Sequence, residues 1–545
     1  MTLFEQILTA RGLTTRAARQ AFLQPDYMAV KHDPFLLPDM KKAVARLKQA
    51  REQGEKIVIY GDYDIDGLSA TALLLDAFGK FGFEDVDAFI PNRFVEGYGM
   101  TMGAVDKVRD MGADLIVTVD TGSLCHAEIA YAASLGIDTV VTDHHNVAET
   151  PPPSVAAVNP KFPGHTYPFR DLCGAGVAFK LVQALQTELD ELPDGYEKWL
   201  LDLVALGTVC DIVTLADENR ANVYWGLEVL KKQQRPGLKA LMAVAGIEPE
   251  QVNARHLGFG LGPRMNAAGR LETAQHALDM LVAHDGLAAL EASEKLEELN
   301  VKRRGIQDAI FEEACEQAEE LADDRVLVVS SGGWNHGVIG IVASKLVEKY
   351  KKPVFIIGER GEEATGSARS FGDFSAADAV RAADDIIIKG GGHGAAAGVT
   401  LATGKIGDFR RRVNEFYDSL QLTNQERYLL PRADVEIDDF SEIDEELVEN
   451  LAKMEPFGNG NPEPVLKITR ASVLSMRRMG ADGQHVKLAL RDKNGKVLQM
   501  LAFNAPEEFF REPGDEVAAW FQPTINEWQG ARTVEGRLLH IILLD

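Results

Sequence analysis

The sequence predicts an α/β protein of several domains, in which two α/β units are joined by a long helix and followed by a small β-barrel. From residue 55 to about 215, apolar β-branched runs alternate with helical patterns, as in βαβ units that build a parallel sheet. A second run of this kind extends from 325 to about 425. The tail from 461 to 545 instead holds short alternating strands separated by turns, which is typical of a barrel. At 545 residues the chain is too long for one core, so about three or four domains are expected.

The expected parts follow one another along the chain. The first 50 residues look helical and short of core residues, which indicates a packing extension. The charged amphipathic pattern at 285–324 predicts a solvated connecting helix. The parts in order are the helical extension (1–50), a parallel-sheet domain (51–284), the connecting helix (285–324), a second α/β domain (325–425), a linker (426–460) and the barrel (461–545).

The barrel is predicted from alternating apolar and polar residues, since such alternation gives a strand one buried face. Turn residues at Asp492–Gly495 and Pro513–Asp515 separate the alternating segments. The strands predicted in this way are Gln484–Leu490, Val497–Phe503, Glu516–Phe521 and Arg537–Leu543.

Acidic residues and histidines stand where four buried segments of the first α/β domain end. Three of the segments are apolar strands, and the fourth is a helix expected from Trp199 to Cys210. In an open parallel sheet, ligands bind beyond the carboxyl ends of the strands, so these side chains are expected to converge. They cannot all stay ionised side by side without cations. Carboxylate and imidazole ligands in this number predict two divalent metals, Mn²⁺ or Mg²⁺, and phosphoester chemistry. The residues concerned are Asp62, Asp64, Asp66, Asp120, Asp143, His144, His145 and Asp211.

Each of these segments has a plainer interpretation when taken alone. Asp62, Asp64 and Asp66 would share one side of an extended segment, with a helix beginning at Leu68. The alternative for them is an Asp-rich turn that caps a helix. Asp120 alone could be a turn residue, the two adjacent histidines a surface pair, and Asp211 a helix cap. The four segments together favour the metal site.

The overall charge argues against long-range attraction of a nucleic acid. The formal net charge is −26, and an acidic chain repels a polyanion at a distance. Any nucleic acid must therefore be held by a local basic groove and by the metals. The four cysteines stand far apart with no Cys-x-x-Cys pair, which excludes a zinc ribbon or a disulfide framework and favours the cytoplasm. No leader or membrane span is expected from the sequence.

Four motifs resemble those of the DHH phosphoesterase family: Gly61–Gly67, Val119–Gly122, Asp143–His145 and Gly207–Asp211. Further motifs resemble the bacterial single-strand-specific exonucleases of the RecJ family within it. The resemblance covers roughly residues 30 to 545 and implies a DHH domain, a DHHA1-type domain and an oligonucleotide-binding (OB) barrel. These further motifs are Asp33–Met40, Pro91–Gly99, Gly262–Arg270, Gly366–Ser370, Gly390–His393 and Pro456–Pro462.

The resemblance also implies roles for the acidic set. Asp64 and Asp120 would bind the first metal, and Asp120 would bridge to a second. The catalytic candidates are His145, facing the scissile phosphate, and Asp62, as a ligand or as support for one. The ligands implied for the second metal are Asp66, Asp120, His144 and Asp211. Related small phosphoesterases carry a histidine where this chain has Tyr60, so the first metal is expected to be weaker or to depend on Asp62.

A second group of residues is expected to bind phosphate and the strand. The planar fork of arginine suits phosphate, although an arginine pair that bridges domains is the alternative for Arg264 and Arg270. Glycine-rich Gly390–Gly398 is predicted as a loop that lets backbone N–H groups approach a phosphate, although a tight turn is its usual meaning. Tyr98 is expected either to stack on a base or to pack in the core. The full set is Arg93, Tyr98, Arg264, Asn266, Arg270, Ser367, Arg369, Gly391, Gly392 and His393.

The leading hypothesis is a 5′→3′ exonuclease that degrades single-stranded DNA to mononucleotides in repair and recombination. By resemblance, single-strand-binding protein and a helicase would be partners. One alternative is a DHH phosphodiesterase for short oligonucleotides or cyclic dinucleotides, which usually lacks the extension and the barrel. Another is a non-catalytic replication scaffold, which has no need for so many close carboxylates. Because every expected ligand precedes residue 212, removal of the barrel is expected to leave the metal site assembled.

Overall fold

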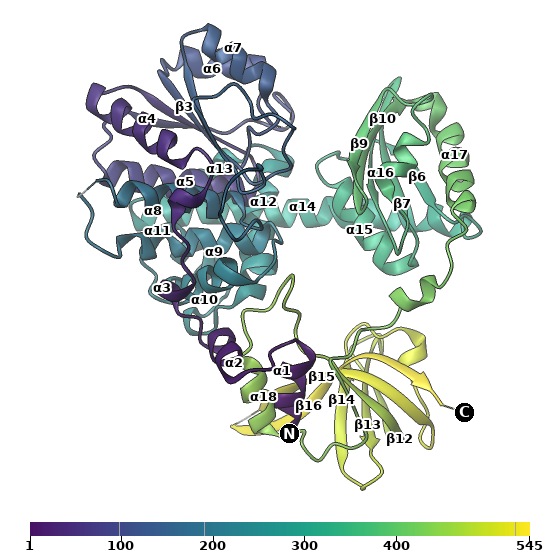
Figure 1. The fold of residues 1–545 in the computed structure, drawn as a ribbon. Helices are drawn as coiled ribbons and strands as arrows, with labels where there is room; N and C mark the ends of the chain where they lie inside the picture. Colours follow the sequence, from purple (N-terminus) through teal and green to yellow (C-terminus); the bar gives the residue numbers. More distant parts are fainter. Residues whose placement is uncertain (98, 190, 529, 545) are drawn as a thin grey trace.

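The computed structural model describes residues 1–97, 99–189, 191–528 and 530–544. Figure 1 shows two α/β domains on either side of one long helix, with the barrel below them. The first domain contains a five-stranded sheet in which every neighbouring pair is parallel. Its order is β2-β1-β3-β4-β5, with strands β1 (Ile57–Gly61), β2 (Val86–Phe89), β3 (Leu115–Val119), β4 (Asp138–Thr142) and β5 (Ala156–Val158).

The direction of strand addition reverses between β1 and β3, and this creates the place where a site can form. The chain runs from β1 to β2 at one edge and then crosses back to β3 on the other side of β1. Helices α4 (Met40–Gln53), α5 (Ile65–Lys80) and α8 (Gly174–Gln186) cover one face, while α6 (Met102–Asp110) and α7 (His126–Ser134) cover the other. Crevices at such reversal points are where open sheets bind ligands.

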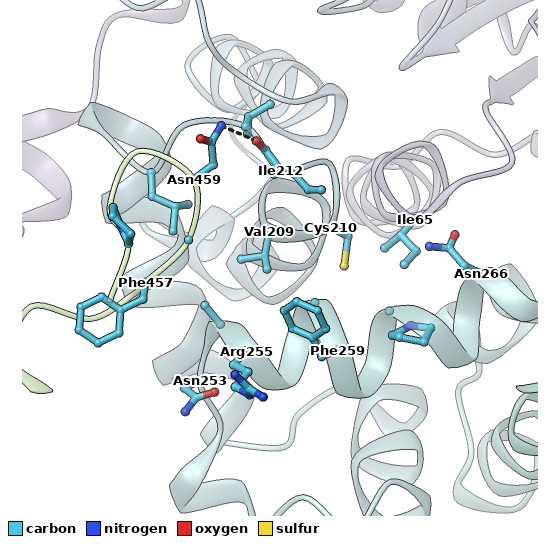
Figure 2. A pocket seen from close by; sticks show the side chains of 18 of the residues that line it. Ile65, Val209, Cys210, Ile212, Asn253, Arg255, Phe259, Asn266, Phe457 and Asn459 are labelled. Carbon is cyan, nitrogen blue, oxygen red and sulfur yellow. Dashed lines mark hydrogen bonds between the residues drawn. The ribbon is translucent and has the colours of Figure 1, made fainter. Parts of the chain in front are cut away.

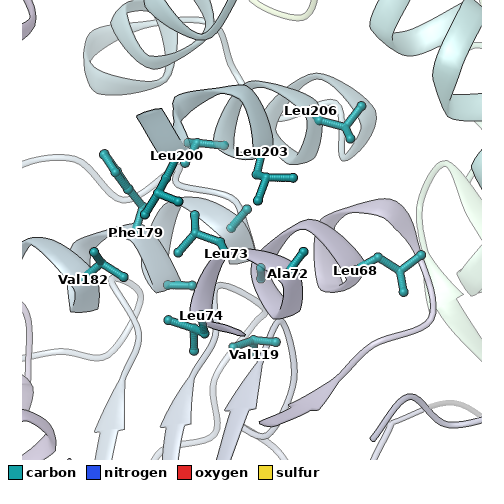
Figure 3. Packing of buried hydrophobic residues seen from close by; sticks show 14 of the residues in the cluster. Leu68, Ala72, Leu73, Leu74, Val119, Phe179, Val182, Leu200, Leu203 and Leu206 are labelled. Atoms are coloured by element: carbon teal, nitrogen blue, oxygen red, sulfur yellow. The ribbon is translucent and has the colours of Figure 1, made fainter. Parts of the chain in front are cut away.

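Helix α5 is enclosed on nearly all sides. Figure 3 shows its leucines between Val119 of β3 and the side chains of α8 and α9 (Leu201–Cys210), with Phe179 and Leu203 among them. A helix that is apolar around its whole circumference requires such burial. Because α5 begins directly after β1, its first turn is fixed at the carboxyl edge of the sheet.

The predicted long helix is present, but it is not a solvated connector. Helix α14 (Gly286–Glu320) has 35 residues, so it is about 52 Å long at 1.5 Å per residue. Leu296 and Leu299 belong to the core of the first domain, while Ile310 and Ala314 belong to that of the second. The many charges of the segment conceal these contacts in the sequence. Preceding it are α10 (Asp217–Lys231), α11 (Pro236–Val244), the π-helix η4 (His256–Leu261), α12 (Gly262–Leu271) and α13 (Gln275–Val282).

The second domain has a mixed five-stranded sheet flanked by α15 (Ile339–Tyr350), α16 (Ala376–Arg381) and α17 (Ile406–Ser419). The prediction of a loop at Gly390–Gly398 was wrong, because most of this segment is a hairpin in which His393 pairs with Ala396. Glycine has a low strand propensity, so only pairing with the neighbouring strand reveals β9. The order is β6-β7-β8-β10-β9, from β6 (Leu327–Gly332), β7 (Val354–Arg360), β8 (Glu363–Arg369), β9 (Lys389–His393) and β10 (Ala396–Ala402).

The tail forms the predicted barrel, closed by pairing of its first and fourth long strands, β12 and β15. Strand β12 was not predicted from the alternation, because it carries many polar residues. The predicted strands that correspond to β15 and β16 were shorter than those observed. A short strand, β11 (Val435–Ile437), adds to β12 at the edge. The barrel strands are β12 (Leu466–Met479), β13 (His485–Arg491), β14 (Val497–Ala502), β15 (Glu516–Trp528) and β16 (Ala531–Leu543).

The N-terminal helices connect the barrel to the first domain. Leu3, Ile7 and Leu8 of α1 (Leu3–Ala10) are buried in the barrel's core, near α18 (Glu445–Ala452). Helix α2 (Arg16–Leu23) follows, and the chain then reaches α3 (Tyr27–Val30) on the first domain. Figure 1 shows both chain ends at the barrel. Among the described residues, none of the helices has the length and apolar content that a bilayer crossing requires.

Candidate metal centre

The structure brings the acidic residues and histidines together at the carboxyl edge of the first sheet. In the described part of the chain, Asp62, Asp64 and Asp120 each offer an oxygen within 4.8 Å of the others. Asp66, His144 and Asp211 form a second such group. The second group adjoins the first, since His144 Nε2 lies 3.0 Å from Asp120 Oδ1. Two adjoining triads of ligand atoms can hold two cations.

The aspartates after β1 converge through a helix terminus rather than through an extended segment. Helix α5 starts at Ile65, not at Leu68, and Asp64 is its N-cap. Asp64 Oδ1 accepts hydrogen bonds from the Asp66 and Gly67 amides at 2.9 and 3.1 Å. The plainer interpretation, an Asp-rich helix cap, is therefore correct for Asp64, and the cap also holds the first turn of α5, which carries Asp66, at the site.

Asp66 is held by a second helix. Its carboxylate accepts hydrogen bonds from the backbone amides of Gly174 (2.5 Å) and Ala175 (2.8 Å), at the start of α8. The positive end of a helix stabilises an anion there. A Cβ atom on Gly174 would lie 2.5 Å from Cβ of Asp120, and one on Gly207 would lie 2.5 Å from Asp66 Oδ1. Glycines at both positions leave the space that the carboxylates occupy.

Asp120 and His144 face each other with ligand atoms that are otherwise unused. Within the part of the chain that the structure describes, the 3.0 Å contact between Asp120 Oδ1 and His144 Nε2 lacks the geometry of a hydrogen bond, and neither buried atom has another hydrogen-bond partner. Such atoms are costly unless something satisfies them. Burial lowers the pKa of His144 to about 4, with the positive charge of His145 contributing, so its imidazole is neutral at physiological pH. A neutral imidazole beside a carboxylate fits a divalent cation.

The carboxyl groups have raised pKa values because they are buried and close to one another. Burial, with the charge of Asp64 adding to it, raises the pKa of Asp62 to about 7 and that of Asp66 to about 6. Burial and the charge of Asp66 raise the pKa of Asp211 to about 8, and they also raise the pKa of Asp120 well above its usual range. Without cations the site cannot hold all of these charges, and two cations would neutralise them.

His145 is oriented by Asp143, which was expected among the converging acidic residues but whose support of His145 was not predicted. Asp143 Oδ1 lies 2.9 Å from His145 Nδ1 and accepts hydrogen bonds from the amides of His144 and His145, while Oδ2 accepts one from Ser123 N. Burial alone would lower the pKa of His145, but the hydrogen bond and charge of Asp143 raise it to about 9. The half-exposed ring is therefore a cationic donor. The signals for Asp143 in the sequence were its position at the end of β4 and its place in the Asp143–His145 motif.

Tyr60 does not take the place of a ligand. Its side chain packs in the opposite face of the sheet with Met100 and Val105, and its hydroxyl donates to the Gly99 carbonyl at 3.1 Å. The oxygens of Asp62, Asp64 and Asp120 therefore make up the first triad without it.

Several of the expected phosphate-binding residues gather beside the metal centre. Burial, followed by the charges of Arg93, Arg303 and Arg369, lowers the pKa of Arg270 to about 10. Arg270 Nη1 donates to the Gly337 carbonyl of the second domain at 2.8 Å, which also fits the alternative of an arginine that bridges domains. We call Arg93, Arg270, Arg303 and Arg369 the arginine cluster. So many guanidinium groups near one another favour an anion between them. Sequence reasoning missed Arg303 because it lies within the charged pattern of α14.

The arginine cluster contains residues of both domains. Arg93 of the first domain lies over the Tyr63 ring, 4.4 Å from its centroid. In the second domain, Arg369 Nη1 donates to Ser367 Oγ at 3.2 Å, so these two residues of β8 lie together as expected.

Among the other candidates, Asn266 lines the same cavity as Arg270 and Arg303, whereas the rest lie apart or are otherwise engaged. Arg264 Nε lies 2.6 Å from Glu297 of α14, which supports the alternative of a structural arginine. Asn266 lines a cavity of about 780 Å³ (Figure 2). Gly391, Gly392 and His393 are exposed on β9. Tyr98 lies outside the described residues. Their roles in binding stay predictions.

Models of known protein families match the first domain, the second domain and the barrel. The model of the DHH family, N-terminal domain, matches residues 56–208. The DHHA1 domain model matches 323–419, and the RecJ OB domain model matches 433–540.

Similar proteins are found along nearly the whole chain. The single-stranded-DNA-specific exonuclease RecJ of Bacillus subtilis is 39% identical over 539 residues, covering 97% of this chain and 66% of that protein. That of Dickeya dadantii is 35% identical, covering 93% and 91%. The crystal structure of RecJ in complex with Mn²⁺ from Thermus thermophilus superposes with a TM-score of 0.83 at 30% identity, covering 99% of this chain and 76% of that one.

Cation binding is expected to strengthen as the pH rises from 6 to 8. The raised pKa values of Asp62 and Asp211 mean that both carboxyl groups keep their protons below this range, so a cation must displace them. The dissociation constant for Mn²⁺ should fall by up to about tenfold per pH unit for each proton displaced. Calorimetric titration at pH 6, 7 and 8 measures it, and a constant affinity would contradict the assignment.

Gly174→Ala is expected to disrupt the centre, because its Cβ would lie 2.5 Å from Cβ of Asp120. Mn²⁺ binding should weaken by about 10- to 100-fold, as it does when groups behind metal ligands are changed. Gly176→Ala is the matched control on the same helix, since its Cβ would meet nothing closer than 3.5 Å. Equal Mn²⁺ affinity in both variants would show that the space at Gly174 is not needed.

Proposed function

The chain belongs to the RecJ family of single-stranded-DNA-specific exonucleases, and from this we propose that it degrades single-stranded DNA from the 5′ end to mononucleotides, using two divalent cations. Mn²⁺ and Mg²⁺ both suit the carboxylate and imidazole ligands. The observation that carries the proposal is the pair of adjoining ligand triads next to the arginine cluster. One feature can cleave a phosphodiester, and the other can hold the phosphates of a strand.

The two triads divide the cations between them. Asp64 and Asp120, with Asp62 beside them, would hold one, and Asp120 would be shared with the other. Bound there, the cations would act as Lewis acids that activate water and offset the charge of the scissile phosphate. The remaining ligands proposed for the second cation are Asp66, His144 and Asp211.

His145 is proposed to donate a hydrogen bond to the scissile phosphate. Asp143 fixes its ring and, against the effect of burial, keeps its pKa near 9, so the ring stays protonated at neutral pH. A half-exposed cation next to the metal centre is suited to an oxygen that gains charge as the bond breaks.

The arginine cluster is proposed to bind phosphates at the 5′ end of the strand. Arg93 and Arg270 come from the first domain, Arg303 from α14 and Arg369 from β8, so an anion between them would bridge both domains. This local positive charge offsets the net charge of −26 where the strand would lie. Ser367, beside Arg369, is proposed as a further donor.

The alternatives fit the chain less well. An enzyme for dinucleotides has no use for an OB barrel, and a scaffold has no use for unsatisfied buried ligand atoms such as those of Asp120 and His144. Family membership supports a further proposal, a cytoplasmic role in repair and recombination alongside single-strand-binding protein and a helicase. The four cysteines are free, which suits a reducing compartment.

Single strands are expected to be digested from the 5′ end in Mn²⁺, while blunt duplexes resist and EDTA stops the reaction. Asp120→Ala should reduce the rate by at least about 10²-fold, because one side chain serves both cations. Gel analysis of strands labelled at one end or the other measures polarity. Digestion from the 3′ end, or equal rates on duplex and single strands, would refute the proposal.

Arg270→Ala is expected to raise the KM for 5′-phosphorylated single strands by about tenfold or more. A hydrogen bond to a charged group contributes about 1.5–3 kcal/mol. Arg304→Ala, which removes a more exposed arginine of the neighbouring α14, is the matched control. Thermal unfolding of both variants checks that the fold is intact. If the two KM values agree, Arg270 has only a structural role.

A further inference from the structure

The motif Pro456–Pro462, which precedes the barrel, has no part in the chemistry described so far. It forms a tight loop closed by two backbone hydrogen bonds, from Gly458 N to the Asn461 carbonyl (2.9 Å) and from Asn461 N to the Gly458 carbonyl (3.1 Å). A loop closed in this way has a defined shape.

The loop binds the segment that directly follows Asp211. Asn459 Nδ2 donates to the Ile212 carbonyl at 2.8 Å, and Leu215 N donates to the Asn459 carbonyl at 2.8 Å. Figure 2 shows the first of these bonds, with Asn459 reaching across to Ile212 at the end of α9. One residue of the linker therefore holds both ends of the turn after a proposed metal ligand.

Close packing reinforces these bonds. A Cβ on Gly458 would lie 2.8 Å from Leu215 Cδ1. Gly460 has a φ of +75°, and its Cβ would lie 2.5 Å from Thr214 Cγ2. The two glycines therefore let the backbone of the loop approach the turn closely.

The turn needs support because its conformation is unfavourable. Ile212 has a φ of +59°, which a β-branched residue rarely adopts. Its side chain is 69% exposed, so side-chain packing does little to hold it there. Strained backbone persists only where its surroundings fix it, and the bonds from Asn459 provide this.

The loop is itself fixed from the other side. Asn461 Nδ2 donates to the carbonyls of Met454 and Pro456, and Arg11 Nη1 donates to Asn461 Oδ1. Arg220 of α10 donates to the Met454, Glu455 and Pro456 carbonyls. The loop therefore joins the barrel, the N-terminal helices and the first domain at one place.

We infer that Asn459 is a positioning residue for Asp211, so that the linker loop before the barrel completes the metal centre. This rests on the proposed function, since Asp211 matters here as a ligand of the second cation. It also revises the expectation that removing the barrel leaves the metal site assembled. Asn459 itself precedes the barrel, but Asn461, the first residue of the barrel segment, closes the loop that carries Asn459, so a cut at residue 461 would remove the closing bonds.

Asn459→Ala in the full-length protein tests this inference. Calorimetric titration of the metal-free protein with Mn²⁺ should show one site unchanged and the other weakened by about tenfold, the lower end for groups that support metal ligands. Hydrolysis of a dinucleotide, too short to reach the barrel, should need correspondingly more Mn²⁺ for half-maximal rate. Asn450→Ala on α18, where the side chain accepts a hydrogen bond from nearby Lys453, is the control and should match the wild type.

Asn459→Asp provides a second test, since it keeps the size of the side chain and the backbone bond to Leu215 but removes the donor to Ile212. It should weaken the same site. If Asn459→Ala and Asn459→Asp, folded as judged by thermal unfolding, bind two Mn²⁺ ions as the wild type does, the inference is overturned. If instead the wild type binds no Mn²⁺ and cleaves neither the dinucleotide nor a longer single strand, the proposed function itself fails.

Discussion

Repulsion among buried carboxylates is the constraint on which the metal centre depends. Asp62, Asp66 and Asp120 are almost fully buried, and each raises the cost of ionising the others. The fold opposes this repulsion with helix N-termini: the amides of α5 meet Asp64, and those of α8 meet Asp66. Both helices are enclosed in the largest core of the protein, so the carboxylates cannot move apart to relieve the repulsion. The helix N-termini do not compensate all of the negative charge. The charge that remains at the carboxyl edge of the sheet is what favours cation binding.

The sequence allowed the location of this centre to be predicted better than its construction. Asp120 and His144 follow strands of a parallel sheet, whose carboxyl ends meet by geometry alone. The prediction that an extended segment places Asp62, Asp64 and Asp66 on one side was wrong, because periodicity does not reveal that a helix already starts at Ile65. Asp143 was expected only as one of the converging acidic residues, because the pattern does not reveal its hydrogen bond to His145 two residues later. Arg303 received no role, because the other arginines of its cluster are far from it in the chain. The hairpin at β9 and the polar strand β12 were missed because pairing overrides propensity there.

Acidity of the chain and binding of a polyanion are compatible because charge is distributed unevenly. Arg93 and Arg270 belong to the first domain and Arg369 to the second, yet the charges of Arg93 and Arg369 both contribute to lowering the pKa of Arg270. Helix α14 holds the two domains in this relation, because residues of its N-terminal half and of its C-terminal half are buried in different cores. The long helix is thus part of the site and not a spacer.

The position of α1 in the barrel has a consequence for biosynthesis. This helix is synthesised long before the barrel, since about 430 residues separate Leu8 from Phe440, with which it shares a core. At 5–20 residues per second, Leu3, Ile7 and Leu8 wait roughly 20–90 s for their partners. An apolar helix face without its partner for that time is a natural target for chaperones that bind nascent chains, and premature release of the chain would leave it exposed. Docking of α1 into the barrel is therefore a late event in making this enzyme.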